Sequence, residues 1–144
     1  MSAPYTATTD PFPHQTEEYT KLYRFYQCLR EGRLVTTRCR DCGRVTWPPK
    51  TVCPECASGE IEWADLPREG TVVSFTVAER GIPAGFPAPT VFVLVQMGPV
   101  RILSRLVDAD PGRVQNGMAV EPDMISVPGT PYSGERVLPV FRPK

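Results

Sequence analysis

The sequence contains very little histidine, which limits the chemistry that the chain could carry out. Histidine occurs once among 144 residues, at His14. Catalysis by a serine or cysteine nucleophile with a histidine base would depend on that single residue, and a hydrolytic metal site built from several histidines is excluded. We therefore expect His14 to be an exposed surface residue and the chain to have no catalytic residues of its own.

Excess charge and long apolar segments are also missing. The 16 lysines and arginines equal the 16 aspartates and glutamates, so the whole chain has no field that attracts nucleic acid or an anionic membrane. Prolines and glycines interrupt the longest uncharged stretch, residues 81–100, which is therefore not a membrane span. Residues 1–10 have neither a basic start nor an apolar run, so we expect no secretory signal and a cytoplasmic location.

Proline, by contrast, is abundant. It accounts for 17 of the 144 residues, more than twice the usual share of about 5%. Hydrophobic residues make up 41% of the chain, which is enough for a folded core. Because proline interrupts regular helices, we expect a mainly β protein with little helix.

The N-terminal part predicts a tail followed by one helix. We expect residues 1–15 to be flexible and residues 16–34 to contain the helix, with Thr16 as its N-cap and Gly32 just beyond its C-terminal end. Apolar residues at helical spacing predict the side that packs on the core or on a partner: Tyr19, Leu22, Tyr23, Tyr26 and Leu29. Because so short a chain has little core to cover this stripe, Tyr23 and Tyr26 are candidates for partner docking.

Two C-x-x-C pairs form the strongest motif in the chain. The four candidate ligands are Cys39, Cys42, Cys53 and Cys56. Four thiolates satisfy the tetrahedral preference of Zn²⁺ and leave no open position, so residues 35–64 predict a zinc ribbon with one structural ion. Two alternatives stay open at this point: paired disulfides, which a reducing compartment disfavours, and a rubredoxin-type iron site, which has the same four-sulfur geometry.

Basic residues gather around these cysteines. Arg38, Arg40, Arg44 and Lys50 outnumber the acids nearby and are candidates to bind a phosphate-bearing ligand or an acidic partner surface. A solvated basic face is the simpler interpretation, and the neutral total disfavours nucleic acid.

The second half of the chain predicts strands separated by turns. Five segments rich in β-branched or alternating apolar residues carry this prediction: 70–78, 90–97, 100–107, 118–127 and 136–141. Five strands within residues 65–144 favour a small closed barrel of the OB-fold type.

The loop at residues 81–89 is unusual because it is apolar, uncharged and stiffened by proline. If exposed it would be a binding surface, and if packed back it would form a lid over the mouth of the barrel. Its candidate partner-docking residues are Gly81, Ile82, Pro83, Phe86 and Pro87.

The order of these features resembles the family catalogued as domain of unknown function 35. Seven segments carry the resemblance, in chain order: LREGRL at 29–34, RCRDCGR at 38–44, WPP at 47–49, VCPEC at 52–56, GTVVSF at 70–75, NGM at 116–118 and LPVFR at 138–142. The resemblance covers about residues 17–143. It is more specific than the cysteine pattern alone because the matches follow one another along the whole chain.

The resemblance implies a rubredoxin-like zinc ribbon followed by an OB-fold, in a protein that partners acyl-CoA enzymes. Relatives accompany thiolase-superfamily subunits in thiolysis, acyl transfer or aldol steps, including those of steroid and aromatic degradation, and the catalytic cysteine and histidine belong to the partner. It therefore implies a required, non-catalytic subunit of an α2β2-type hetero-oligomer. The barrel and the 81–89 loop would dock the partner and could hold the pantetheine arm of coenzyme A, while nearby arginines would suit its phosphates.

A single-stranded nucleic-acid-binding module is the alternative function. A zinc ribbon joined to an OB-fold is a common architecture for that purpose. However, the predicted strands at 71–77 and 90–97 contain no lysine or arginine, which disfavours this alternative. Salt-dependent binding of single-stranded DNA or RNA would support it.

Overall fold

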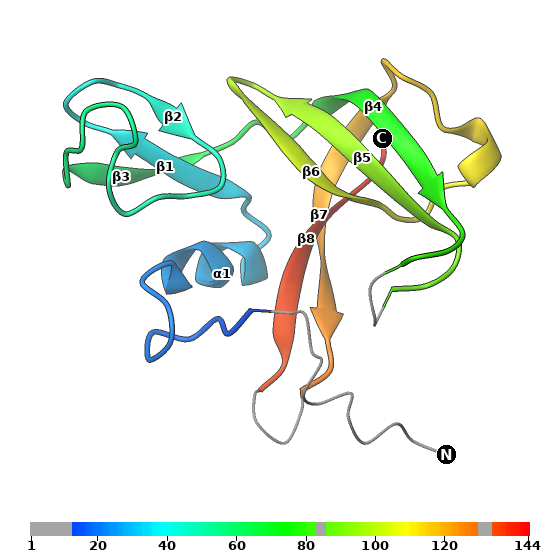
Figure 1. The fold of residues 1–144 in the computed structure, drawn as a ribbon, viewed down its shortest axis with the longest axis horizontal. Helices are drawn as coiled ribbons and strands as arrows, with labels where there is room; N and C mark the ends of the chain where they lie inside the picture. Colours follow the sequence, from blue (N-terminus) through cyan, green and yellow to red (C-terminus); the bar gives the residue numbers. More distant parts are fainter. Residues whose placement is uncertain (1–12, 83–85, 130–133) are drawn as a thin grey trace.

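The computed structural model describes residues 13–82, 86–129 and 134–144, which form a short helix, a small antiparallel sheet and a β-barrel (Figure 1). In chain order the elements are α1 (Tyr23–Arg30), β1 (Val35–Cys39), β2 (Val45–Thr46), β3 (Ile61–Asp65), β4 (Gly70–Ala78), β5 (Thr90–Met97), β6 (Val100–Leu106), the 3-10 turn η2 (Pro111–Arg113), β7 (Ala119–Val127) and β8 (Arg136–Pro143). Within these described ranges, no helix has the length and apolar content needed to cross a membrane.

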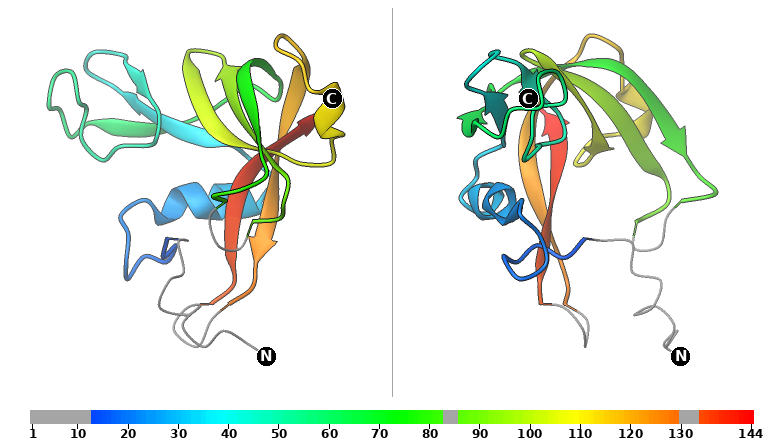
Figure 2. Two further views of the ribbon diagram at one scale, coloured as in Figure 1. Left: turned by 45° about the vertical axis from the view of Figure 1, so that its right-hand side comes forward. Right: turned by 60° about the vertical axis from the view of Figure 1, so that its left-hand side comes forward.

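The barrel is built from the last five strands, in the order β4-β5-β6-β8-β7. The circle closes where β8 runs parallel to β6 at Leu106 and Phe141, and where β7 meets β4 at Gly70 and Val120. Figure 2 shows the long β7–β8 hairpin extending beyond the barrel toward α1. This architecture confirms the predicted fold class, which is mainly β with an N-terminal helix, a cysteine-bearing ribbon and a five-stranded barrel of the OB type.

The wall of the barrel has an inner face and an outer face. Along β5, every second residue from Val91 to Met97 is buried in the barrel interior. Because residues directly opposite in a β-ladder point to the same face, the intervening residues and their partners on β6 lie on the outer face. The outer pairs include Phe92 with Arg105 and Leu94 with Leu103.

The ribbon sheet has the order β2-β1-β3 and lies beside the barrel (Figure 1). Its central strand β1 is the most buried, and Thr36 and Thr37 are almost completely covered. Their hydroxyls do not stay unpaired: Thr37 Oγ1 accepts a 2.8 Å hydrogen bond from the backbone N–H of Lys50, and Thr36 donates to the carbonyl of Thr46. These bonds fix the loop that leads into the second cysteine pair.

Helix α1 is shorter than predicted. It begins at Tyr23 instead of near Thr16, and Leu22 is its N-cap residue, without a side-chain capping bond. The carbonyl of Thr16 accepts the N–H groups of Tyr19 and Thr20, so residues 16–20 form a separate turn. Gly32 has a φ of +80°, as expected for a glycine just beyond a helix end.

The buried side of α1 also differs from the predicted stripe. The covered residues are Phe25, Cys28 and Leu29, whereas Tyr19 is 65% exposed. The helix packs on both β1 and β8, and this rotates the buried side by about one residue relative to the stripe of tyrosines. Phe25 has no polar atom and fills that contact better than a tyrosine would, because a buried tyrosine hydroxyl needs a partner.

Gln15 fastens the start of the described chain to its C-terminal strand. Its side-chain amide donates to the carbonyl of Val137 at 2.6 Å and its side-chain oxygen accepts the N–H of Val137 at 2.9 Å. Gln15 is only 4% exposed. We expected residues 1–15 to form a flexible tail, and the structure instead fixes Gln15. Residues 1–12 lie outside the described residues.

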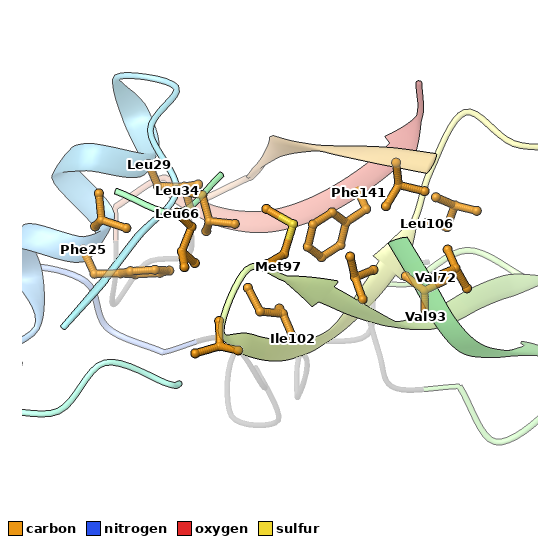
Figure 3. Packing of buried hydrophobic residues seen from close by; sticks show 14 of the residues in the cluster. Phe25, Leu29, Leu34, Leu66, Val72, Val93, Met97, Ile102, Leu106 and Phe141 are labelled. Carbon is orange, nitrogen blue, oxygen red and sulfur yellow. The ribbon is translucent and has the colours of Figure 1, made fainter. Parts of the chain in front are cut away.

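One continuous core joins the helix, the ribbon and the barrel (Figure 3). Phe25, Leu34 and Leu66 lie at the end near the helix, and Met97 and Phe141 continue the same cluster into the barrel. The backbone N–H of Leu66 donates to the carbonyl of Leu34 at 2.9 Å, where the ribbon connects to the barrel. The ribbon and the barrel are therefore packed together as well as linked in sequence.

Candidate metal centre and interaction surfaces

The four predicted ligand cysteines converge at one point. The sulfur atoms of Cys39, Cys42, Cys53 and Cys56 all lie within 4.8 Å of one another. The Cys39–Cys56 and Cys42–Cys53 sulfur pairs are both 3.6 Å apart, close to the edge of about 3.8 Å in a tetrahedron with metal–sulfur bonds of about 2.3 Å. A disulfide needs about 2.05 Å, so the paired-disulfide alternative does not fit. The four-sulfur set fits Zn²⁺, whose role there would be structural.

The two cysteine pairs sit in matching backbone turns. In the first turn, the N–H of Gly43 donates to the carbonyl of Cys39, and in the second the N–H of Ala57 donates to the carbonyl of Cys53, both at 2.9 Å. Gly43 and Ala57 also share a positive φ, of 77° and 61°. These turns let both sulfurs of each pair face the same point.

The local electrostatics show why the four thiols need a cation. The backbone N–H of Cys56 lowers the pKa of Cys53 to about 7, and the backbone N–H of Cys42 lowers the pKa of Cys39. Although the N–H of Ser58 acts in the same direction on Cys56, contact with the sulfur of Cys39 and burial raise the pKa of Cys56 to about 12. Without a cation, the four thiols therefore do not all ionise near neutral pH, and a bound divalent ion removes that barrier.

The matching turns lead to a prediction about Gly43 and Ala57. A Cβ added at Gly43 would meet no atom within 4 Å, so the cost of Gly43→Ala comes from its positive φ alone and should be about 1 kcal/mol of folding stability. Ala57→Gly removes the corresponding strain, but glycine loses more entropy on folding, which offsets part of that gain. We therefore expect the free energy of unfolding to be unchanged or slightly higher. Denaturant unfolding of the metal-loaded variants measures both. Equal destabilisation by the two changes would contradict this account.

The candidate arginines of the ribbon are paired with acids. Arg38 and Arg40 approach the carboxylate of Glu62 at 3.8 and 3.3 Å, and Arg44 pairs with Glu55 at 2.9 Å. Lys50 is exposed and makes no ion pair with any residue in the described ranges. The sequence did not predict Glu62 as the partner of these arginines, because Glu62 comes from another strand, where it lies directly opposite Arg38. This pairing reduces the basic field of the ribbon and disfavours the nucleic-acid alternative.

The candidate docking loop at residues 81–89 packs partly onto the barrel. Phe86 is half-buried and lies against Phe92, with ring centroids 6.1 Å apart. Because Phe92 is on the outer face, the ring of Phe86 contacts the outer wall of the barrel. Gly81 and Pro87 are exposed and Ile82 is half-buried, while Pro83 lies outside the described residues.

The two candidate tyrosines lie on α1 and are both half-buried. Tyr26 meets the edge of Phe25, with ring centroids 5.1 Å apart, and burial raises the pKa of its hydroxyl. It therefore belongs to the margin of the core more than to an open surface. Tyr23 is not part of the core cluster.

His14 is exposed, and its ring stacks on Tyr19 with centroids 4.6 Å apart. The fifth cysteine, Cys28, is buried in α1 and is not among the cysteines of the metal cluster. The histidine is therefore exposed to solvent, whereas the thiol of Cys28 is buried in the core.

A hollow lies at the junction of the ribbon and the barrel. It has a volume of about 290 Å³ and is lined by Gly32, Arg33, Leu34, Asp65, Leu66, Pro67, Arg68 and Pro122. A two-pronged contact between Arg33 and Asp65, at 3.0 and 3.2 Å, holds one side of it. The guanidinium keeps the pKa of Asp65 below its usual range.

Models of two protein domains match the chain one after the other. The first is described as "ChsH2, rubredoxin-like zinc ribbon domain" and matches residues 29–62. The second is described as "ChsH2, C-terminal OB-fold domain" and matches residues 63–124. The convergent cysteines and the closed barrel agree with these two descriptions.

Curated proteins with similar sequences point in the same direction. A "DUF35 domain-containing scaffold protein" from Pyrococcus furiosus is 34% identical over 103 residues, which is 68% of this chain and 74% of that protein. A "probable enoyl-CoA hydratase alpha subunit" from Thermomonospora curvata is 31% identical over 120 residues. The matched region is 83% of this chain but only 36% of that longer relative.

Among solved structures, a chain of the "Ltp2-ChsH2(DUF35) aldolase" has a similar fold. It superimposes with a TM-score of 0.72 at 28% sequence identity, over 89% of this chain and 98% of that chain. The similarity therefore extends through the helix, the ribbon and the barrel.

Proposed function

The chain belongs to the DUF35 family, and from this premise we propose that it is a non-catalytic but required subunit of a complex with a thiolase-superfamily enzyme. The partner would act on an acyl-CoA by thiolysis, acyl transfer or a related carbon–carbon bond step. The observation that carries the proposal is the match over 89% of this chain to a chain of the solved Ltp2-ChsH2(DUF35) aldolase.

The side chains of this protein support an auxiliary role. Four of its five cysteines form the metal cluster, and the fifth, Cys28, is buried in the core. A thiolase-type reaction needs an accessible nucleophile with a base beside it. In the proposed complex, both groups belong to the partner, and this chain supplies a rigid surface held together by the metal and the continuous core.

We also propose that coenzyme A lies between the two subunits. The hollow of about 290 Å³ beside Leu34 and Leu66 is just smaller than the ~300–1,000 Å³ typical of small-molecule sites. A ligand as long as coenzyme A would therefore need cover from the partner as well. Arg68, which lines this hollow, and the ribbon residues Arg38 and Lys50 are candidates for its phosphates.

The proposed assembly is an α2β2-type hetero-oligomer in the cytoplasm. A four-thiolate metal site is compatible with that compartment, where thiols are kept from forming disulfides. Within the family, steroid and aromatic degradation are pathways in which such an enzyme would serve.

Co-expression with a thiolase-superfamily protein from the same genome tests the proposal. We expect the two chains to purify together through affinity and size-exclusion steps, and we expect cleavage or transfer of the acyl-CoA only when both are present. Each chain alone, at the same concentration, is the control. Full activity of the partner alone, or failure of the two chains to associate, would contradict a required subunit.

A further inference from the structure

The outer face of the β5–β6 hairpin combines exposed apolar surface with positive charge. Leu103 is 70% exposed, which makes it the most exposed of the large hydrophobic residues that the structure describes. Strands β4, β5 and β6 contain no aspartate or glutamate, and their two charged residues are Arg101 and Arg105, both on the outer face of β6. An acidic partner surface is therefore the electrostatic complement of this face.

Arg105 is almost completely buried in this face although it carries a charge. It is 8% exposed, and its guanidinium lies 4.2 Å from the centre of the Phe86 ring. Burial lowers the pKa of Arg105. The Phe86 ring covers one flat side of the guanidinium. The N–H bonds of the guanidinium lie in its own plane and therefore do not point at the ring. Stacking therefore holds Arg105 in place without using its hydrogen-bond donors.

Arg105 also differs from the paired arginines of the same protein. Arg33 bonds Asp65, Arg44 pairs with Glu55, and Arg142 contacts both Glu121 and Asp123. For Arg105, no carboxylate within ion-pair distance and no hydrogen-bond acceptor is found in the described part of the chain. Among the described residues, no nitrogen of Arg105 is a fully buried polar atom without a hydrogen-bond partner, so its donors still reach the surface. An incoming carboxylate would pair there with a partly desolvated cation.

We propose that Arg105 binds a carboxylate side chain of the catalytic partner subunit, with Leu103 and Leu94 packing against apolar side chains around it. Arginine is enriched among the residues that dominate binding energy at interfaces, and the contacts that surround such a residue exclude water from it. A protein fits this face better than a nucleic acid, because a phosphate backbone needs several exposed cations, and Arg101 is already bonded to Gln96 at 2.9 Å. The inference rests on the proposed function and names the contact that the complex uses.

Titration of the partner enzyme with variants of this chain tests the contact. We expect Arg105→Gln to weaken binding about 30-fold, the effect of a typical interface hot spot. Arg105→Lys keeps the charge but loses the planar fork, so it should weaken binding by about 5- to 10-fold. Leu103→Ser should weaken binding about 10-fold.

The matched controls are Val52→Ser, which changes an exposed aliphatic residue of the ribbon, and Arg113→Gln, which changes a side chain that is 89% exposed on η2. Both controls should bind within twofold of the wild type.

The outcomes separate this contact from the broader proposal. If the wild-type chain fails to bind the partner, the proposed function fails. If the wild type binds, but Leu103→Ser and both Arg105 variants bind as tightly, the contact is overturned and the proposed function stands. Circular dichroism shows whether each variant is folded. If Arg105→Gln does not fold, the binding of Leu103→Ser tests the contact instead, because a residue that is 70% exposed has little structural role. Single-stranded DNA binding that Arg105→Gln abolishes would also overturn the contact.

Discussion

Replacing Cys42 by serine is expected to remove the bound metal and unfold the ribbon while the barrel stays folded. Metal binding supplies most of the folding energy of such a small module, about 10–16 kcal/mol in zinc-finger peptides. The ribbon sheet has one five-residue strand paired with a two-residue strand and another five-residue strand, which is too little structure to stay folded alone. The barrel contributes most of the continuous core, including Val93 and Phe141, which are completely buried.

Elemental analysis and hydrogen exchange measure this outcome together. The wild-type chain should carry one equivalent of zinc and protect the amides of β1 and β3. Cys42→Ser should hold much less than one equivalent and lose that protection, while the amides of β5 stay protected. Cys28→Ala is the matched control, because Cys28 is buried outside the cluster, and it should keep its zinc. Iron in place of zinc would revive the rubredoxin-type alternative, and a metal-free wild type that keeps a folded ribbon would contradict a structural metal.

The second large effect is expected at Gly70, where β4 meets both β5 and β7. A Cβ at this position would lie 2.6 Å from Val95 Cγ1, 2.9 Å from the backbone oxygen of Gln96, and also too close to the sulfur of Met97. Because one of these atoms belongs to the backbone, the ladder must shift to make room. We expect Gly70→Ala to lower the free energy of unfolding by about 3 kcal/mol, a large part of the ~5–15 kcal/mol of a typical domain.

The control for this prediction is another glycine without such neighbours. A Cβ at Gly59 would meet no atom within 4 Å, and its φ is not in the left-handed region. Gly59→Ala should therefore change the free energy of unfolding by no more than about 0.5 kcal/mol. Urea unfolding followed by circular dichroism compares the two variants, and a Gly70→Ala chain as stable as Gly59→Ala would show that the barrel absorbs a methyl group there.

The features that the sequence predicted well are set by local chemistry. The spacing of two C-x-x-C pairs is sufficient to place four sulfurs around one ion, and the convergence of those sulfurs confirms it. Each strand of the barrel is rich in β-branched or alternating apolar residues, so the predicted strands match β4 to β8 with ends that differ by no more than two residues. Boundaries of this kind depend on the last hydrogen bond of a ladder, which sequence patterns do not specify.

The features that were missed depend on residues far apart in sequence. The buried side of α1 is set by its contacts with β1 and β8, so Leu29 of the predicted stripe is buried, whereas the other two buried residues, Phe25 and Cys28, lie outside that stripe. Glu62 neutralises ribbon arginines only because β1 and β3 pair in a particular register. The stacking of Arg105 on Phe86 likewise depends on how a loop folds back onto the barrel. In each case, the residues next to the side chain in sequence do not indicate which distant residue it contacts in the folded protein.

The bond between Gln15 and Val137 has a consequence for the order in which the protein acquires its structure during synthesis. The four cysteines lie within residues 39–56, so the ribbon can capture its ion as soon as that segment leaves the ribosome. Gln15 and α1, by contrast, contact β8, which emerges about 80 residues later, a delay of roughly 4–16 s at ~5–20 residues per second. During that interval α1 lacks its β8 contacts, and the nascent chain leaves part of the helix's apolar side, which carries Phe25 and Leu29, uncovered beside a finished metal site.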